Sequence, residues 1–147
     1  MLELGCTSVD PGNDFTVPTF TFDQNFFYCH VEPQYIFGAA YQCGKGGPND
    51  PPNGCHFNAS AVSGMALQNH PLVDCGGGDQ PVNPGDVAEG TPAESNYEAV
   101  SLEMSSDYTS AALYVRPSGS NHPRQIFNPA TDMTVGPLLA KWASLSQ

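Results

Sequence analysis

Apolar runs alternate with long polar stretches rich in glycine and proline along the chain. The most apolar run spans residues 21–42 and contains Pro33. Because proline is tolerated best in the first turn of a helix, we predict a helix over Pro33–Gln42, preceded by a short helix over Asp23–Tyr28. At helical spacing, the apolar face of the helix over Pro33–Gln42 would consist of Ile36, Phe37, Ala40 and Tyr41.

The rest of the chain gives weaker helical patterns. We expect short helices over Phe57–Gln68, Glu94–Ser105 and Ser110–Arg116, and a terminal helix that begins at Pro137. The terminal helix has an apolar stripe of Leu138, Leu139, Trp142 and Leu145. Long loops are predicted wherever glycine and proline gather, above all over residues 44–54 and 71–92. The predicted fold class is therefore mainly α, a small domain of short helices joined by long loops.

The first twenty residues differ in character from the rest. They carry β-branched and aromatic residues with interrupting prolines, and so predict an extended arm over 1–20 ahead of a domain over 21–147. Such an arm can dock on a neighbouring copy and build an open filament, or it can act as a tether. Cys6 follows Leu4-Gly5 as in a bacterial lipoprotein signal, and a lipid anchor, a bond between subunits and a plain cysteine all stay open for it.

Charge and cysteine content narrow the class of protein. Four Lys and Arg stand against fifteen Asp and Glu, a net charge of −11 in 147 residues. That balance excludes a duplex nucleic-acid binder, which needs clustered cations for phosphate contacts. Five cysteines with so little lysine indicate an exported protein, periplasmic, anchored at the outer surface or extracellular. A chain of this length with so much glycine and proline is expected to have a thin hydrophobic core, and such a core calls for a staple or a cofactor.

The most informative chemistry lies at Cys43 and Cys55-His56. A second cysteine followed directly by histidine is the haem c attachment signature, in which two thiols bond the porphyrin and the imidazole binds iron. The usual spacing is two residues, whereas eleven separate Cys43 from Cys55. Those eleven are mostly glycine, proline and asparagine, which can loop out and leave the two cysteines close together.

On these residues the chain resembles a divergent monohaem c-type cytochrome. The resemblance covers about Phe26 to Leu145, and it rests on Cys-His after an aromatic helix, on the segment 107–116 and on the Leu138–Trp142 helix. It implies a cytochrome-c-like domain that carries one covalent haem c and transfers electrons to a redox partner protein. An enzyme is the least favoured class, because two axial protein ligands leave iron no open position.

The resemblance also implies a ligand set. The thioethers would form at Cys43 and Cys55, and His56 would be the proximal iron ligand. His122 lies in the loop where such cytochromes carry a distal methionine, so it is the expected distal ligand. His70 and Met104 remain rivals for that position.

Other uses of the cysteines stay open. If Cys43 and Cys55 hold haem, Cys29 and Cys75 remain as a natural disulfide, although Cys29-His30 with Cys6 would be a second, expanded haem motif. Without haem, Cys29, Cys43, Cys55 and Cys75 could form two disulfides in any of three connectivities, as in a structural surface or filament subunit. A zinc site built from two cysteines, His56 and a fourth ligand is a further alternative.

Overall fold

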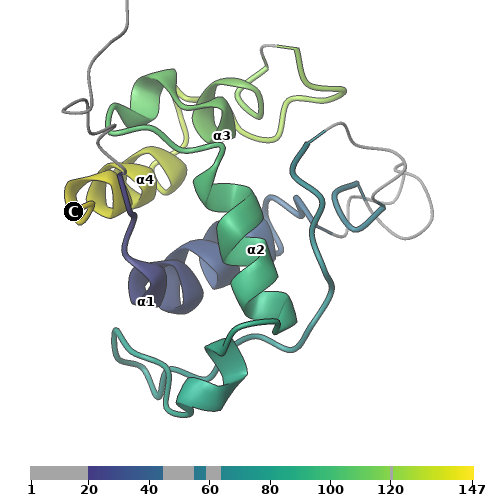
Figure 1. Cartoon of the computed structure of the whole chain (residues 1–147). Coiled ribbons are helices and arrows are strands. Elements are labelled where there is room, and N and C mark those ends of the chain that lie inside the picture. Colours follow the sequence, from purple (N-terminus) through teal and green to yellow (C-terminus); the bar gives the residue numbers. More distant parts are fainter. Residues whose placement is uncertain (1–19, 45–54, 59–63, 120) are drawn as a thin grey trace, which may run out of the picture.

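The computed structural model of the chain describes residues 20–44, 55–58, 64–119 and 121–147. These residues form a small, mainly α domain of four short α-helices and further single-turn or wider helices, without a β-strand (Figure 1). The predicted fold class is thus confirmed as mainly α. The predicted arm falls almost entirely on residues 1–19, outside the described residues. The elements in chain order are α1 (Gln24–Phe26), η1 (Phe27–Ile36), η2 (Pro84–Val87), α2 (Pro92–Ser101), η3 (Tyr108–Ser110), α3 (Ala112–Val115) and α4 (Val135–Ser144).

α1 and η1 form one continuous helix where the sequence predicted two. The carboxylate of Asp23 caps it by accepting the N–H of Phe26 at 2.7 Å, so the predicted helix over Asp23–Tyr28 is present. The predicted start at Pro33 is wrong, because η1 runs through Pro33 and ends at Ile36. η1 has π-type hydrogen bonding, and its wider turn relieves the clash that a proline ring makes with the carbonyl one α-turn earlier.

The later helices lie close to their predicted places. α2 begins at Pro92 behind the N-cap Thr91, two residues before the predicted start, and ends at Ser101. α4 begins at Val135, so Pro137 lies inside its first turn rather than at its first residue. The predicted stripe of α4 is buried at Leu138, Leu139 and Trp142.

The helix predicted over Phe57–Gln68 is wrong for the described part of that range. Residues 57–58 and 64–68 are irregular, and several of their backbone groups bond to distant partners. The N–H of Leu67 donates to the carbonyl of His56 at 2.8 Å. The N–H of Gln68 donates to the side chain of Asn96 at 2.7 Å. Tertiary bonds therefore replace the helical ones.

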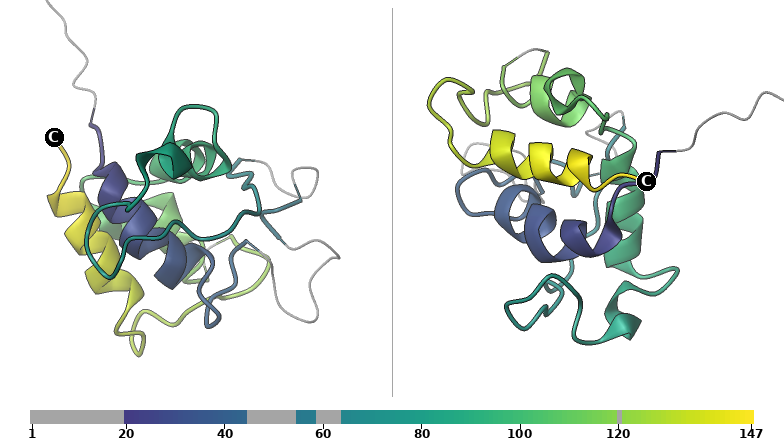
Figure 2. Two further views of the ribbon diagram at one scale, coloured as in Figure 1. Left: turned by 90° about the horizontal axis from the view of Figure 1, so that it is seen from below. Right: turned by 90° about the vertical axis from the view of Figure 1, so that its left-hand side faces the viewer.

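The core lies where α4 packs along the α1–η1 helix (Figure 2). The ring of Trp142 is fully buried and contacts Phe22, Phe27 and Tyr97, with ring centroids 5.3, 5.5 and 6.5 Å away. Its indole N–H donates to the carbonyl of Asp23 at 2.8 Å, so the buried polar atom is satisfied. No described helix is long and apolar enough to cross a bilayer.

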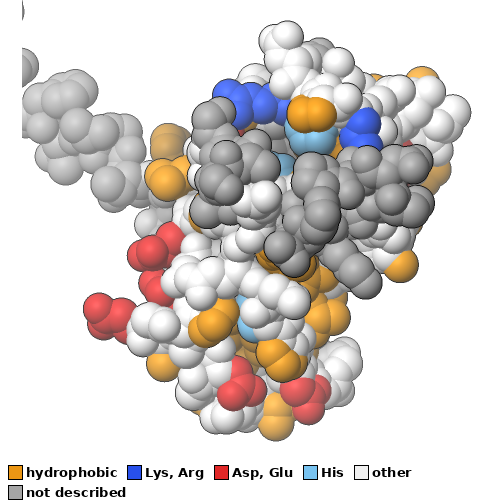
Figure 3. Space-filling model, turned by 90° about the vertical axis from the view of Figure 1, so that its right-hand side faces the viewer, with side chains coloured by type: hydrophobic (Ala, Val, Ile, Leu, Met, Phe, Trp, Pro, Cys, Tyr) orange, Lys and Arg blue, Asp and Glu red, His pale blue; other side chains and the backbone are white. Residues whose placement is uncertain are grey.

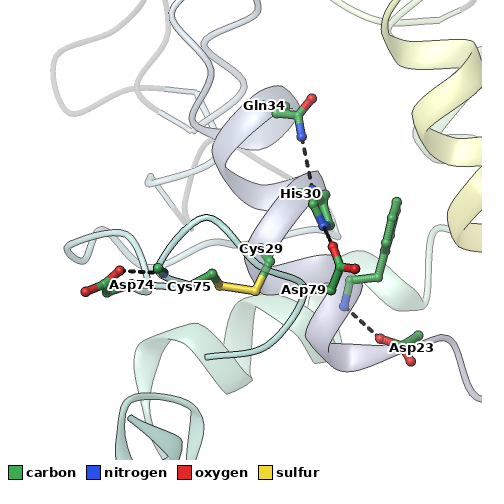
Figure 4. The surroundings of a disulfide bond; sticks show 9 residues. Asp23, Cys29, His30, Gln34, Asp74, Cys75 and Asp79 are labelled. Carbon is green, nitrogen blue, oxygen red and sulfur yellow. Dashed lines mark hydrogen bonds and ion pairs between the residues drawn. A yellow bond between two sulfur atoms is a disulfide. The ribbon is translucent and has the colours of Figure 1, made fainter. Parts of the chain in front are cut away.

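A disulfide joins η1 to the long loop that precedes α2. It links Cys29 to Cys75, the pairing expected if the other two cysteines of the domain bind haem (Figure 4). Next to it on the same helix, the ring of His30 bonds to Asp79 at 2.7 Å. The disulfide and this pair together hold the glycine-rich loop against the domain.

Candidate functional site

The chain brings Cys43 and Cys55-His56 together despite the eleven residues between them. The N–H of His56 donates to the carbonyl of Cys43 at 3.3 Å, and the N–H of Phe57 donates to the carbonyl of Gly44 at 3.3 Å. The N–H of Gly44 donates to the carbonyl of Ile36 at 3.2 Å, which fixes this short ladder to the end of η1. The two halves of the Cys…Cys-His pattern are therefore neighbours in space.

Gly44 is needed for this close approach. The ring of Phe57 lies directly over it, and a β-carbon at that position would come within 2.5 Å of the ring. Any residue other than glycine at position 44 would force the ring of Phe57 to move, and Phe57 directly follows His56. The ring of Phe57 in turn meets Phe37 edge-on, with centroids 5.3 Å apart.

One pocket collects the residues that the sequence singled out. Cys43, Cys55, His56 and His122 all line it. The cavity they leave is about 20 Å³, room for one water molecule. A haem is far larger than this cavity, so the pocket would have to open to hold one. The remaining lining residues are Tyr35, Gln42, Met65, Leu113, Pro117, Arg124 and Ile126.

The ring of His56 is held in one tautomer. Its Nδ1 lies 2.7 Å from the carbonyl oxygen of Met65, and because a carbonyl only accepts, Nδ1 carries the proton. Burial lowers the pKa of His56, so its imidazole is neutral at pH 7. Nε2 then keeps its lone pair, which is the state that a metal ligand requires.

His122 repeats the same arrangement from another loop. Its Nδ1 donates to the carbonyl of Arg124 at 2.6 Å. The loop is closed at its base by the N–H of Ile126, which donates to the carbonyl of Pro117 at 2.7 Å. Asn121, directly before His122, has φ +62°, a left-handed conformation that asparagine adopts more readily than most residues.

The two imidazoles have the separation that a shared metal ion would set. Their ring centroids are 6.2 Å apart and their planes meet at 21°. A ligating imidazole nitrogen lies about 2.0–2.1 Å from its metal and roughly 1.1 Å from its own ring centre, so two imidazoles on opposite sides of one metal have centroids about 6.3 Å apart. The separation of the two rings thus matches that of two imidazoles on one metal ion.

The two cysteines of the pocket are thiols. Burial raises the pKa of Cys43 to about 12, against the opposing charge of Arg124. In the described ranges, no three His, Cys, Asp or Glu side chains are grouped closely enough to hold a small metal ion. The described residues thus give no support to the zinc alternative.

The rival distal ligands lie elsewhere. Both ring nitrogens of His70 are engaged, Nδ1 with the carbonyl of Pro71 at 2.7 Å and Nε2 with Glu32 at 3.0 Å. Met104 is half-buried against the hydrophobic core. Neither residue lines the pocket. The structure thus brings His122, and not these two residues, to His56.

Arg124 belongs to the site, although no pattern in the sequence singled it out. Its carbonyl orients His122, the residue lines the pocket, and its charge acts on Cys43. It is one of only four Lys and Arg residues in the chain and lies two positions after His122, which was the available signal. On the face shown in Figure 3, cationic side chains flank a histidine at one end, and acidic side chains gather towards the other.

Comparison with known proteins adds no relative to this description. The chain matches no protein-family model, no curated protein and no solved structure. Inference about function therefore rests on the sequence pattern and on the geometry of the pocket.

Proposed function

We propose that the protein is an extracytoplasmic electron-transfer protein that carries one haem c. In this proposal Cys43 and Cys55 form the thioether bonds, and His56 and His122 are the axial iron ligands. The observation that carries it is the pair of imidazole rings 6.2 Å apart, each with its Nδ1 proton bound to a backbone carbonyl. Such outer hydrogen bonds fix the tautomer and the ring orientation of metal-ligating histidines.

The order of the elements supports a cytochrome-c-like domain. An aromatic helix ends shortly before Cys43, and the terminal helix α4 packs along it through Trp142. Haem would supply the redox chemistry, and the chain would supply attachment, ligation and partial exclusion of water. Imidazole in place of a distal thioether lowers the reduction potential, because His/Met ligation raises it.

Two protein ligands on one iron favour electron transfer over catalysis. No coordination position remains for a substrate, so we expect no enzymatic activity at this site. The partner would be another redox protein. The Cys29–Cys75 disulfide supports an oxidising compartment, in agreement with an exported protein. Self-association through the arm over residues 1–20, with Cys6 near its tip, belongs to the same proposal and would line up the haems of successive copies.

The visible spectrum of the full chain, produced with a c-type haem maturation system, tests the proposal. We expect a low-spin six-coordinate spectrum, and His122→Ala should convert it to a five-coordinate or ligand-binding form. His30→Ala is the matched control, because His30 lies on η1 and bonds to Asp79 away from the pocket. An unchanged spectrum in His122→Ala would reject His122 as the distal ligand, and a colourless protein would reject haem altogether.

A disulfide-stapled structural subunit without a cofactor is the second candidate. The Cys29–Cys75 bond favours it, because a small exported domain with a thin core is often held together in this way. This candidate predicts a colourless protein. It also predicts that Cys43 and Cys55 can be replaced together without any change in the way the chain assembles.

A further inference from the structure

A buried polar cluster lies between η1 and α2. Glu32 is fully buried in η1, and its Oε1 accepts one hydrogen bond from Nε2 of His70 and one from the amide of Asn96, both at 3.0 Å. Its Oε2 is also buried and has no hydrogen-bond partner among the described residues. Because a buried carboxylate costs several kcal/mol unless it is paired, its presence in the core needs a reason.

The cluster clamps an irregular segment of backbone. Asn96 is fully buried on α2, and its side chain bonds to both backbone groups of Gln68: Oδ1 accepts the N–H at 2.7 Å and Nδ2 donates to the carbonyl at 3.0 Å. His70, two residues further on, bonds to Glu32. The segment around Gln68 is thus fixed to two helices at once.

That same segment orients His56. The N–H of Leu67, next to Gln68, donates to the carbonyl of His56 at 2.8 Å. The carbonyl of Met65 accepts the Nδ1 proton of His56 at 2.7 Å. A continuous chain of hydrogen bonds and four residues of backbone, 65–68, therefore connects the buried carboxylate to the proximal imidazole.

A second route runs through aromatic contacts. The ring of His70 meets Phe37 edge-on with centroids 5.4 Å apart, and Phe37 meets Phe57 in the same way at 5.3 Å. Phe57 directly follows His56. Movement of His70 would therefore also reach the backbone of His56 through these two ring contacts.

We propose that Glu32, His70 and Asn96 are positioning residues for the proximal iron ligand His56, and that the proton held between Glu32 and His70 keeps them in place. This inference rests on the proposed function. The cluster acts on the orientation of the His56 ring through the backbone of residues 65–68.

The hydrogen-bond geometry of His70 explains why the proton matters. Both ring nitrogens face oxygen acceptors, the carbonyl of Pro71 and the carboxylate of Glu32, so a proton must lie on each contact. The hydrogen bond to Glu32 raises the pKa of His70, against the effect of burial. Glu32 is the titratable group that faces His70 from η1. The neutral amide of Asn96, on α2, bonds to Glu32, and the uncharged ring of Phe37 contacts His70. Loss of the proton would leave Nε2 and Oε1 as two acceptors 3.0 Å apart.

Resonance Raman spectroscopy of the iron–histidine stretch tests the proposal directly. The measurement uses the full haem-loaded chain with His122→Ala, so that His56 is the protein ligand left on the ferrous iron. We expect a shift or broadening of this band in Glu32→Gln and in His70→Gln. His30→Gln is the matched control. His30 also lies on η1 and also pairs with a carboxylate, that of Asp79 at 2.7 Å, but this pair is on the surface.

The pH dependence gives a second readout that does not depend on how the Glu32 variant folds. In the His122→Ala parent we expect the band to change in one step as pH rises above the usual histidine value of about 6.5, and we expect this step to be lost in His70→Gln. A band that stays constant with pH and in both variants, even where their thermal stability falls, would overturn the inference and leave a structural role only. Protein without haem would instead reject the proposed function itself, which the spectrum reveals before any variant is compared.

Discussion

Removal of the Cys29–Cys75 disulfide should destabilise the domain strongly without affecting the pocket. The bond closes a loop with a sequence separation of 46. The chain-entropy relation gives about 13–14 cal/mol/K for a loop of that length, or about 4 kcal/mol at 25 °C. For a domain of this size each kcal/mol corresponds to roughly 2–4 °C, so Tm should fall by about 8–16 °C. Neither cysteine lines the pocket, and the native haem spectrum should therefore persist.

Urea unfolding of the full chain and of the Cys29→Ser/Cys75→Ser double variant, followed by far-UV circular dichroism, measures this effect. His30→Gln serves as the matched control, since it removes the neighbouring exposed contact to Asp79 and should cost at most about 1 kcal/mol. A loss in the double variant no larger than in the control would refute the reasoning that the disulfide restricts the unfolded chain. Loss of the haem bands under native conditions would refute the separation of the disulfide from the pocket.

Three further variants probe the ladder, the start of α4 and the buried cluster. Gly44→Ala forces a β-carbon against the ring of Phe57 and should cost about 1–3 kcal/mol in urea unfolding, whereas Gly78→Ala, with only an ordinary contact, should stay within about 0.5 kcal/mol. Burial raises the pKa of Asp132, but hydrogen bonds from the backbone N–H groups at the start of α4 and from a tyrosine hydroxyl outweigh burial, so the pKa is lowered overall. The carboxylate therefore stabilises the fold at pH values above its usual pKa near 3.8, and this stabilisation is lost as pH falls further. Asp132→Asn should remove this acid-dependent loss when stability is measured as a function of pH. His70 shows the opposite sign: its raised pKa means that its contribution is complete below about 6.5 and is lost as pH rises through the folded-state value, so His70→Gln should lack this alkaline decline in Tm.

Helical periodicity predicted the closing helix well and the first helix only in part. Leu138, Leu139 and Trp142 repeat at helical spacing, and all three are buried where α4 meets the core. Pro33 misled the prediction because proline normally marks the start of an α-helix, whereas the wider turn of η1 accepts it in the interior. Local sequence carries no clear signal for that change of helix type.

Long-range hydrogen bonds explain what the sequence missed between residues 57 and 68. Apolar residues in this range suggested a helix, but Asn96 binds both backbone groups of Gln68 and holds the described part irregular. A single asparagine some thirty positions away gives no pattern that predicts such a clamp. For the same reason, Glu32 would be expected on an exposed face of its helix rather than in the core.

The sequence was more informative about the candidate site, because the proposed haem attachment demands particular residue types. Cys43, Cys55 and His56 stood out by their order alone, and the glycine- and proline-rich insertion between the cysteines allowed them to meet. His122 came from resemblance, and the structure now places its ring 6.2 Å from that of His56. The carbonyls that hold both rings could not be predicted, since backbone acceptors leave no mark in the sequence.

Intact mass spectrometry of the full chain, matured with haem and then denatured, reduced and treated with a thiol-alkylating reagent, tests the central claim most directly. The account predicts the mass of the polypeptide plus one haem plus the groups added to the alkylated cysteines, with Cys43 and Cys55 protected from alkylation and Cys29 and Cys75 both modified. A mass without haem, with Cys43 and Cys55 alkylated, would contradict it.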